Sequence, residues 1–172
     1  LNNSNKVDKN LLMHLIGGQG GYNIYHPVIN HPLADSDVFN KALDIHKDGV
    51  IDQVIGSKIP NIPVDVQGRL LDHSVSIGDK SLTRKIIRNT EDESILNKAA
   101  LNKDLIDKHL YTILDNKHTS ANVLHNIVNT VHNSKTDFSY LPKTEINKYV
   151  REHKNADVSV LSAINKHLSE LE

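Results

Sequence analysis

The chain has 172 residues, with 20 basic and 21 acidic side chains and a formal net charge of −1 when histidine is neutral. This length suits one domain or one compact array of repeats, and the charge balance excludes a strongly basic nucleic-acid binder and an acidic tail. The absence of cysteine excludes disulfides, a thiolate nucleophile and cysteine-ligated zinc.

The first residues give no targeting signal. Residues 1–5 have neither the basic start nor the apolar core of a signal peptide. No apolar run in the sequence approaches the ~20 residues of a membrane span, so no membrane contact is predicted. Because the chain lacks an initiator Met, we expect a fragment, a processed product or part of a longer protein.

The N-terminal part, residues 1–35, is predicted to cap the rest of the chain. Apolar residues at helical spacing predict a helix there. They are Val7, Leu11, Leu12, Leu15 and Ile16. Glycines within 17–21 then break the chain, and 22–31 is expected to be extended or irregular. The glycines lack the Lys-Ser/Thr that a phosphate-binding P-loop needs, so a flexible linker is the better interpretation.

Five apolar pairs recur through residues 36–172, with spacings of 28, 29, 28 and 36 between their first members. The pairs are Ala42-Leu43, Leu70-Leu71, Ala99-Ala100, Ile127-Val128 and Ala163-Ile164. An apolar residue stands four positions before each of the first four pairs, which marks one face of a helix. A loop insertion at 134–143 explains the longer last spacing.

A second set of apolar segments lies between these helices, at 50–55, 82–87, 105–114 and 146–150. The unit is therefore helix, turn, helix, with a period of about 28 residues. We predict an all-α fold of degenerate tandem helix-pair repeats, which forms either a short α-solenoid or an irregular helical bundle.

The turns between the helices carry their own signals. Pro60 and Pro63 must interrupt a helix, because proline lacks an N–H and restricts the residue before it. Thr90 and Glu93 have the spacing of a capping box. Ser120, with Thr119 before it, is expected to cap the next helix, and the last helix is expected over 157–171.

Residues 79–89, Asp-Lys-Ser-Leu-Thr-Arg-Lys-Ile-Ile-Arg-Asn, lead into Thr-Glu-Asp-Glu-Ser-Ile-Leu-Asn-Lys-Ala at 90–99. This segment resembles a unit of HEAT-like and leucine-rich-variant helical repeats, with Arg84 at the repeat's arginine position. Residues 47–63 are similar but lack that arginine. The resemblance spans about 36–170 and extends to arrays in some bacteriophage proteins. It implies a binding scaffold without a reaction, in which Arg84 pairs with acidic groups of a neighbouring repeat.

The densest basic cluster lies on one predicted helix and consists of Lys80, Arg84, Lys85 and Arg88. Arg84 and Arg88 are one turn apart, so they share a face that can clamp phosphates. Three acidic residues follow at 91–93 and weaken the local potential. The alternative to a binding site is therefore a solvated face with salt bridges.

The histidines do not form a recognisable metal motif. His118, His125 and His132 are seven apart, which separates helical neighbours by ~10.5 Å, too far to share one zinc. His14, His26 and His31 lie around the glycine-rich break without a ligand motif. No metal and no cofactor are predicted.

The predicted function is a protein–protein interaction or assembly module, with a virion-associated component as its most specific form. Its partner is another protein or a second copy of the chain, in the cytoplasm or a virion. One alternative is a nucleic-acid-binding repeat protein that uses Lys80, Lys85 and Arg88, joined by Lys98 and Lys103. Another is a small effector enzyme with a site near 22–32, although no catalytic motif is present and no enzyme is predicted.

Overall fold

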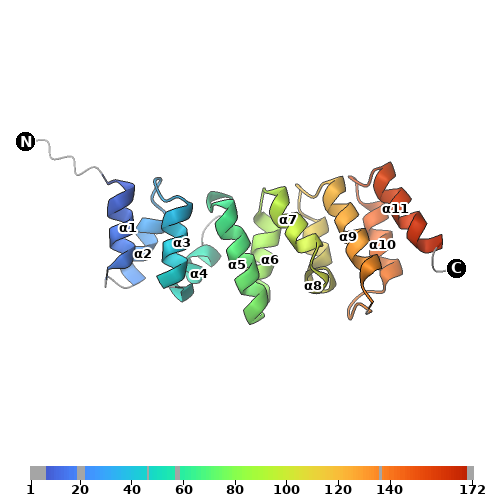
Figure 1. The fold of residues 1–172 in the computed structure, drawn as a ribbon, viewed down its shortest axis with the longest axis horizontal. Helices are drawn as coiled ribbons and strands as arrows, with labels where there is room; N and C mark the ends of the chain where they lie inside the picture. The colour runs from blue at the N-terminus through green and yellow to red at the C-terminus, as the bar shows by residue number, and fades with distance from the viewer. Residues whose placement is uncertain (1–6, 19–21, 46, 57–58, 136, 170–172) are drawn as a thin grey trace, which may run out of the picture. The chain divides into compact units, whose positions relative to one another are not determined.

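The structure is a computed structural model. It describes residues 7–18, 22–45, 47–56, 59–135 and 137–169. These residues form α-helices joined by turns and one short 3-10 helix, and no strand occurs among them. The all-α fold predicted from the apolar spacing is therefore confirmed. The chain divides into two compact units, residues 1–77 and 78–172. Figure 1 labels the helices of both units.

The unit of residues 1–77 contains two layers of helices. Its elements are α1 (Lys9–Gly17), α2 (Tyr22–Ile29), α3 (Ser36–Ile45), α4 (Lys47–Gly56), η1 (Ile59–Asn61) and α5 (Val64–Ile77). Helix α3 packs against α1 on one side and α5 on the other, while α2 packs against α4. The apolar residues of the repeat pattern, such as Val38, Ala42 and Leu70, are fully buried between these layers.

The segment predicted to be extended or irregular is a helix instead. In α2, Tyr25, Val28 and Ile29 are buried, and their spacing places them on one helical face. Pro27 obscured this short stripe in the sequence, because a proline inside a helix removes a backbone hydrogen bond. Of the glycine-rich break, Gly17 ends α1 and Gly18 caps it, and residues 19–21 lie outside the described residues.

The expected boundary after residue 35 does not separate compact units. Helices α1 and α2 pack against α3 within the unit of residues 1–77. The division falls instead at Gly78, which follows α5 with a φ of 72°, in the left-handed region that favours glycine.

The unit of residues 78–172 repeats the two-layer arrangement. Its elements are α6 (Lys80–Asn89), α7 (Glu93–Ala100), α8 (Lys103–Leu114), α9 (Ala121–Asn133), α10 (Lys143–Glu152) and α11 (Val158–Ser169). Helix α9 packs against both α7 and α11, and α6 packs against α8. Residues 134–142 connect α9 to α10.

Short polar side chains begin most of these helices. The Ser120 hydroxyl accepts a hydrogen bond from the Val123 N–H, so this predicted cap is confirmed. The predicted capping box is wrong: Asp92 caps α7, while Thr90 lies at the end of α6 and accepts from the Asp92 N–H. Glu93 is consequently free to bond another helix.

Each unit contains a buried carboxamide that satisfies backbone carbonyls in a connection between helices. Asn116 Nδ2 donates to the carbonyl oxygens of Ile87 at 2.8 Å and Thr90 at 3.0 Å. Gln67 Nε2 donates to those of Ile59 at 3.2 Å and Ile62 at 2.7 Å. Because unpaired buried carbonyls are costly, these side chains fix the path of the chain between successive helices.

None of the helices in the described part of the chain combines the length and the hydropathy that a bilayer crossing requires.

Candidate functional site

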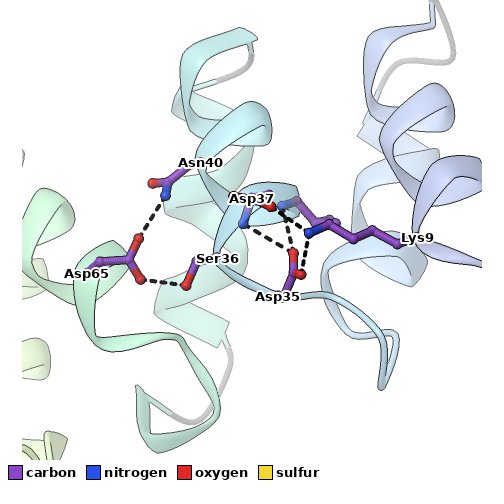
Figure 2. Close-up of polar contacts among 7 residues, drawn as sticks. Lys9, Asp35, Ser36, Asp37, Asn40 and Asp65 are labelled. Carbon is purple, nitrogen blue, oxygen red and sulfur yellow. Dashed lines mark hydrogen bonds and ion pairs between the residues drawn. The ribbon is translucent and has the colours of Figure 1, made fainter.

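Polar side chains on the odd-numbered helices of the unit of residues 1–77 bond to one another (Figure 2). Lys9 of α1 pairs with Asp35, at 2.6 Å, and with Asp37 of α3. Asp65 of α5 accepts hydrogen bonds from Ser36, at 2.6 Å, and Asn40, at 2.8 Å, of α3. The bonds from Ser36 and Asn40 lower the pKa of Asp65, and the bond from Lys9 lowers that of Asp35.

The cations of this unit are held in the same way. Arg69 of α5 donates to Asn40 Oδ1 and to Asp44 Oδ1 of α3, both at 2.6 Å. Lys41 Nζ of α3 donates to the Met13 carbonyl of α1 at 2.9 Å. Every lysine or arginine of this unit whose side chain the structure describes therefore bonds to another segment of the unit.

A carboxylate also joins α7 to α9 in the unit of residues 78–172, but here it bonds to the helix that follows in the layer and not to the one that precedes. Glu93 accepts hydrogen bonds from Ser120 at 2.8 Å and Asn122 at 3.2 Å, and these bonds lower the pKa of its carboxyl. Asp37, Asp65 and Glu93 are spaced by 28 residues, so a repeating acidic position carries these contacts between helices. The 28-residue spacing of these acidic residues was a sequence signal for the contacts, but the sequence analysis followed the apolar pairs and missed it.

The predicted basic cluster behaves differently. Lys80, Arg84 and Arg88 are exposed on α6 and Lys85 is half-buried. None of the four side chains makes an ion pair or a hydrogen bond with a residue that the structure describes. The salt-bridged face and the pairing of Arg84 with an acidic neighbour are therefore both wrong for this part of the chain.

The acidic residues that follow the cluster have other partners. Glu91 pairs with Lys117 at 3.3 Å, Asp92 caps α7, and Glu93 bonds to α9. Each of these carboxylates therefore bonds to a partner other than the cations of α6.

Two of the four predicted residues, Lys80 and Arg84, line a cavity of about 340 Å³, whereas Lys85 and Arg88 do not. We call it the His109 cavity. Its other lining residues come from α8 and from the α9–α10 connection: Asp107, Lys108, His109, Leu110, Tyr111, Tyr140 and Leu141. Pockets of about 300–1,000 Å³ are typical of small-ligand sites, so this cavity can hold a side chain or a small ligand.

His109 is the most unusual residue of the cavity. It is 4% exposed, and its Nδ1 has no hydrogen-bond partner among the described residues. Helix α8 is kinked at this position, where φ is −134° and ψ is 16°. Burial lowers the pKa of His109, and the positive charges of Arg84, Lys108 and Lys80 lower it further. The imidazole is therefore neutral at pH 7.

Side-chain contacts hold the α9–α10 connection against α8. The Tyr140 N–H donates to Asp107 Oδ1 at 3.0 Å, and Lys103 Nζ lies 4.7 Å from the centre of the Phe138 ring. Lys143 Nζ donates to the Ser134 carbonyl at 2.6 Å. These contacts hold Tyr140 at the cavity with 64% of its surface exposed.

A second tyrosine lines the same cavity from α8. Tyr111 is 50% exposed and meets Tyr149 of α10 edge-to-face, with ring centres 5.1 Å apart. Tyr149 lies beside Tyr111 and Glu145, and hydrogen bonding with them raises its pKa. The cavity thus combines cations with two accessible aromatic rings.

Two histidines of the 118–132 group contact neighbouring side chains. His132 stacks on His167 of α11 with ring centres 3.6 Å apart, and His125 Nδ1 lies 3.0 Å from Asn129 Nδ2. No group of three histidine or acidic residues that could hold a metal ion occurs in the described part of the chain.

The segment proposed for an enzyme site also borders a cavity of about 340 Å³, lined by residues of 29–34, Phe39, Asn61 and Ile62. His31 is the single titratable side chain among these lining residues, and its Nδ1 accepts a hydrogen bond from the Leu33 N–H. This cavity presents no acid–base pair, and the enzyme alternative stays a prediction.

Comparison of the chain with protein-family models, with curated proteins and with solved structures finds no match.

Five polar or aromatic residues of the His109 cavity were missed in the sequence: Asp107, Lys108, His109, Tyr111 and Tyr140. One signal was present, because His109 interrupts the apolar stripe of Leu105, Ile106, Leu110 and Ile113. A polar residue at a core position of a helix is a candidate for function. Tyr140 gave no such signal, since it stands in a loop that only folding brings to α8.

Proposed function

We propose that the protein is a partner-binding module of helix pairs, in which the unit of residues 78–172 docks a protein partner at the His109 cavity. The main observation in support is that Lys80 and Arg84 have no ion pair with a described residue and lie beside two exposed tyrosines. The HEAT-like repeat resemblance and a virion-associated role belong to the same proposal.

The composition of the cavity supports a protein partner. Tyrosine and arginine are enriched among the residues that dominate binding energies at protein interfaces. Tyr111 and Tyr140 offer apolar rings with a polar end, and their backbones are already held by α8 and by the bond to Asp107. A surface that is ordered before binding loses less conformational entropy when the partner arrives.

Nucleic acid is the second candidate, because single strands bind where aromatic rings and cations alternate. The charge distribution argues against it. Lys85 and Arg88 lie outside the cavity, whereas the carboxylate of Asp107 lies within it. A polyanion is held by a continuous row of cations along its backbone, which the His109 cavity does not provide.

The test is molar mass by light scattering during size-exclusion chromatography, at low and moderate salt, on protein purified without nuclease. A defined oligomer or a co-eluting protein that persists at moderate salt, and is lost in the Tyr140→Ala variant, supports the proposal. A monomer carrying nucleic acid that moderate salt removes would overturn it in favour of the second candidate.

A further inference from the structure

We propose that the His109 cavity binds an oxyanion carried by a peptide of the partner, with the anion at Lys80, Arg84 and His109 and an apolar or aromatic group of the peptide against Tyr111 and Tyr140. This inference rests on the proposed function, because it names the chemistry that the partner presents at the same cavity.

The charges of the lining residues indicate that the cavity binds an anion. Lys80 and Arg84 are on successive turns of α6, and Lys108 adds a third positive charge from α8. Asp107 is the one carboxylate among the lining residues, and its Oδ1 already accepts the Tyr140 N–H. Arginine presents a planar fork that matches an oxyanion in a bidentate manner. The surplus of positive charge suits one carboxylate or phosphate group.

His109 supplies the second, independent observation. Its side chain is buried at the cavity and its Nδ1 lacks a partner among the described residues. A buried polar atom without a hydrogen bond is costly, but Nδ1 has almost no accessible surface, so a ligand in the cavity acts on the imidazole ring through charge and not through a bond to Nδ1. An oxyanion beside the ring stabilises its protonated form, which the neighbouring cations disfavour.

The volume and the lining residues of the cavity indicate what kind of molecule carries the anion. A cavity of about 340 Å³ is much larger than one carboxylate or phosphate group. Leu110, Leu141 and the two tyrosines provide the remaining lining, which suits an aliphatic or aromatic group next to the anion. A peptide with an acidic or phosphorylated side chain beside an apolar residue has both features.

Binding is coupled to protonation of His109. The charged and titratable groups that line the cavity around it are Lys80 and Arg84 from α6, Asp107, Lys108 and Tyr111 from α8, and Tyr140 from the α9–α10 connection. The bound anion opposes the three cations and raises the pKa of His109, so the complex takes up a proton. Affinity therefore rises as the pH falls from the bound pKa towards the lower free pKa.

The first experiment is an NMR titration of the full chain with phenyl phosphate, phenylacetate and inorganic phosphate. We expect the two aromatic anions to bind with dissociation constants of about 1 mM, as suits ligands of this size, and inorganic phosphate to bind at least fivefold more weakly. The ratio of the two aromatic anions distinguishes a phosphorylated side chain from a carboxylate as the natural group.

Matched variants on one helix locate the site. Arg84→Gln removes a lining cation, whereas Arg88→Gln removes an exposed cation one turn further along α6 that does not line the cavity. We expect Arg84→Gln to weaken phenylacetate binding about tenfold, the loss typical of one charge-assisted hydrogen bond. Arg88→Gln should change it less than twofold, and equal losses in the two variants would overturn the site.

The proton coupling is measured with phenylacetate, because a carboxylate stays ionised between pH 5.5 and 7.5 whereas phosphate titrates near pH 6. We expect the His109 ring resonances to report a higher pKa with the ligand bound, and affinity to rise about three- to tenfold from pH 7.5 to 5.5, within the limit for one proton. The His109→Gln variant should lose this dependence. If that variant does not fold, the His109 pKa of the wild-type chain, with and without ligand, decides the question.

Three outcomes would overturn the inference: no binding of either aromatic anion at 10 mM, binding that leaves the His109 resonances unchanged, or tighter binding of a single-stranded oligonucleotide that Arg84→Gln and Arg88→Gln weaken equally. The proposed function is judged separately. A protein partner whose binding is lost in Tyr140→Ala would keep that proposal in place even if the small anions do not bind.

Discussion

The two units differ in how they use some of their lysine and arginine side chains. In residues 1–77, Lys9, Lys41 and Arg69 each bond to another segment of the same unit. In residues 78–172, Lys80 and Arg84 have no such partner among the described residues, although three carboxylates follow them closely in the sequence. The second unit therefore keeps an available cationic surface where the first unit has contacts between helices.

This difference shows how one helix-pair pattern can serve two purposes. Asp65 and Glu93 are 28 residues apart, and both bond to a neighbouring helix, Asp65 to the preceding α3 and Glu93 to the following α9. Where the cations bond within the unit, they contribute to its stability. Where a buried imidazole and two cations remain unpaired, the free energy of their interactions is available to a partner.

The largest expected effect tests the feature that the two units share. Asn116→Ala leaves the buried carbonyls of Ile87 and Thr90 without a donor, and we expect the free energy of unfolding of its unit to fall by about 3 kcal/mol. Gln67→Ala should lower that of the other unit by about 2 kcal/mol. Urea unfolding combined with hydrogen exchange measures each unit separately. The exposed Asn122→Ala is the control, and a similar loss there would contradict the structural role of Asn116.

The next effect separates the units. His109→Leu replaces a buried polar ring that lacks a partner with an apolar side chain, and we expect the free energy of unfolding of its unit to rise by about 1 kcal/mol at pH 7. The same variant should lose phenylacetate binding. A loss of stability with retained binding would show that His109 is a structural residue.

His109 also gives a pH dependence with a definite sign. Its folded pKa lies below the ordinary value of 6.5, so the unfolded chain binds more protons below that pH. The free energy of unfolding of residues 78–172 should therefore fall as the pH decreases from about 6.5 towards the folded pKa. His109→Leu should remove this part of the slope in urea titrations between pH 5 and 8, while residues 1–77 stay unchanged.

A smaller effect should be equal in the two units. Asp65→Asn and Glu93→Gln replace charge-assisted hydrogen bonds with neutral ones, and we expect each to lower the free energy of unfolding by about 0.5 kcal/mol at pH 7. Both carboxyls have lowered pKa values, so their contribution is present above the unfolded pKa and is lost as the pH falls through the folded pKa. The variants should thus approach the wild type at pH 3. A cost that persists there would mean that shape, not charge, matters.

The smallest expected effect comes from replacing arginine with methionine at one position in each unit. Arg69→Met removes a partly exposed ion pair with Asp44 and should cost at most about 0.5 kcal/mol, less in high salt. Arg84→Met removes no ion pair or hydrogen bond with a described residue, so we expect thermal unfolding to be unchanged while phenylacetate binding is weakened. Destabilisation by Arg84→Met larger than that by Arg69→Met would reverse the comparison.

Most helices could be predicted from the sequence because their buried apolar residues recur at helical spacing. Val66 and Leu70 in α5, or Val123 and Ile127 in α9, show the helical spacing directly, and all four are fully buried. Helix α2 was missed because Pro27 interrupts a short stripe. The capping box failed because Thr90 and Asp92 are both acceptable caps in sequence, and only the end of α6 decides between them.

Half of the predicted basic cluster proved to line the candidate site. Lys80, Arg84 and Arg88 follow one another at one-turn spacing, but Arg88 does not line the cavity, and Lys85 lies on a different face of α6. Helical periodicity shows which cations share a face, but it cannot say which part of that face meets another helix.

The sequence by itself determined that the chain is all-α and where most of its helices lie, because apolar periodicity and proline act over a few residues. Tertiary structure alone decided that Asp92 and Glu93 bond away from α6, that His109 is buried without a partner for Nδ1, and that Tyr140 returns to α8. These outcomes depend on contacts between segments far apart in the chain. No local pattern encodes such contacts, since the free energy of each one depends on which side chains the other segments present.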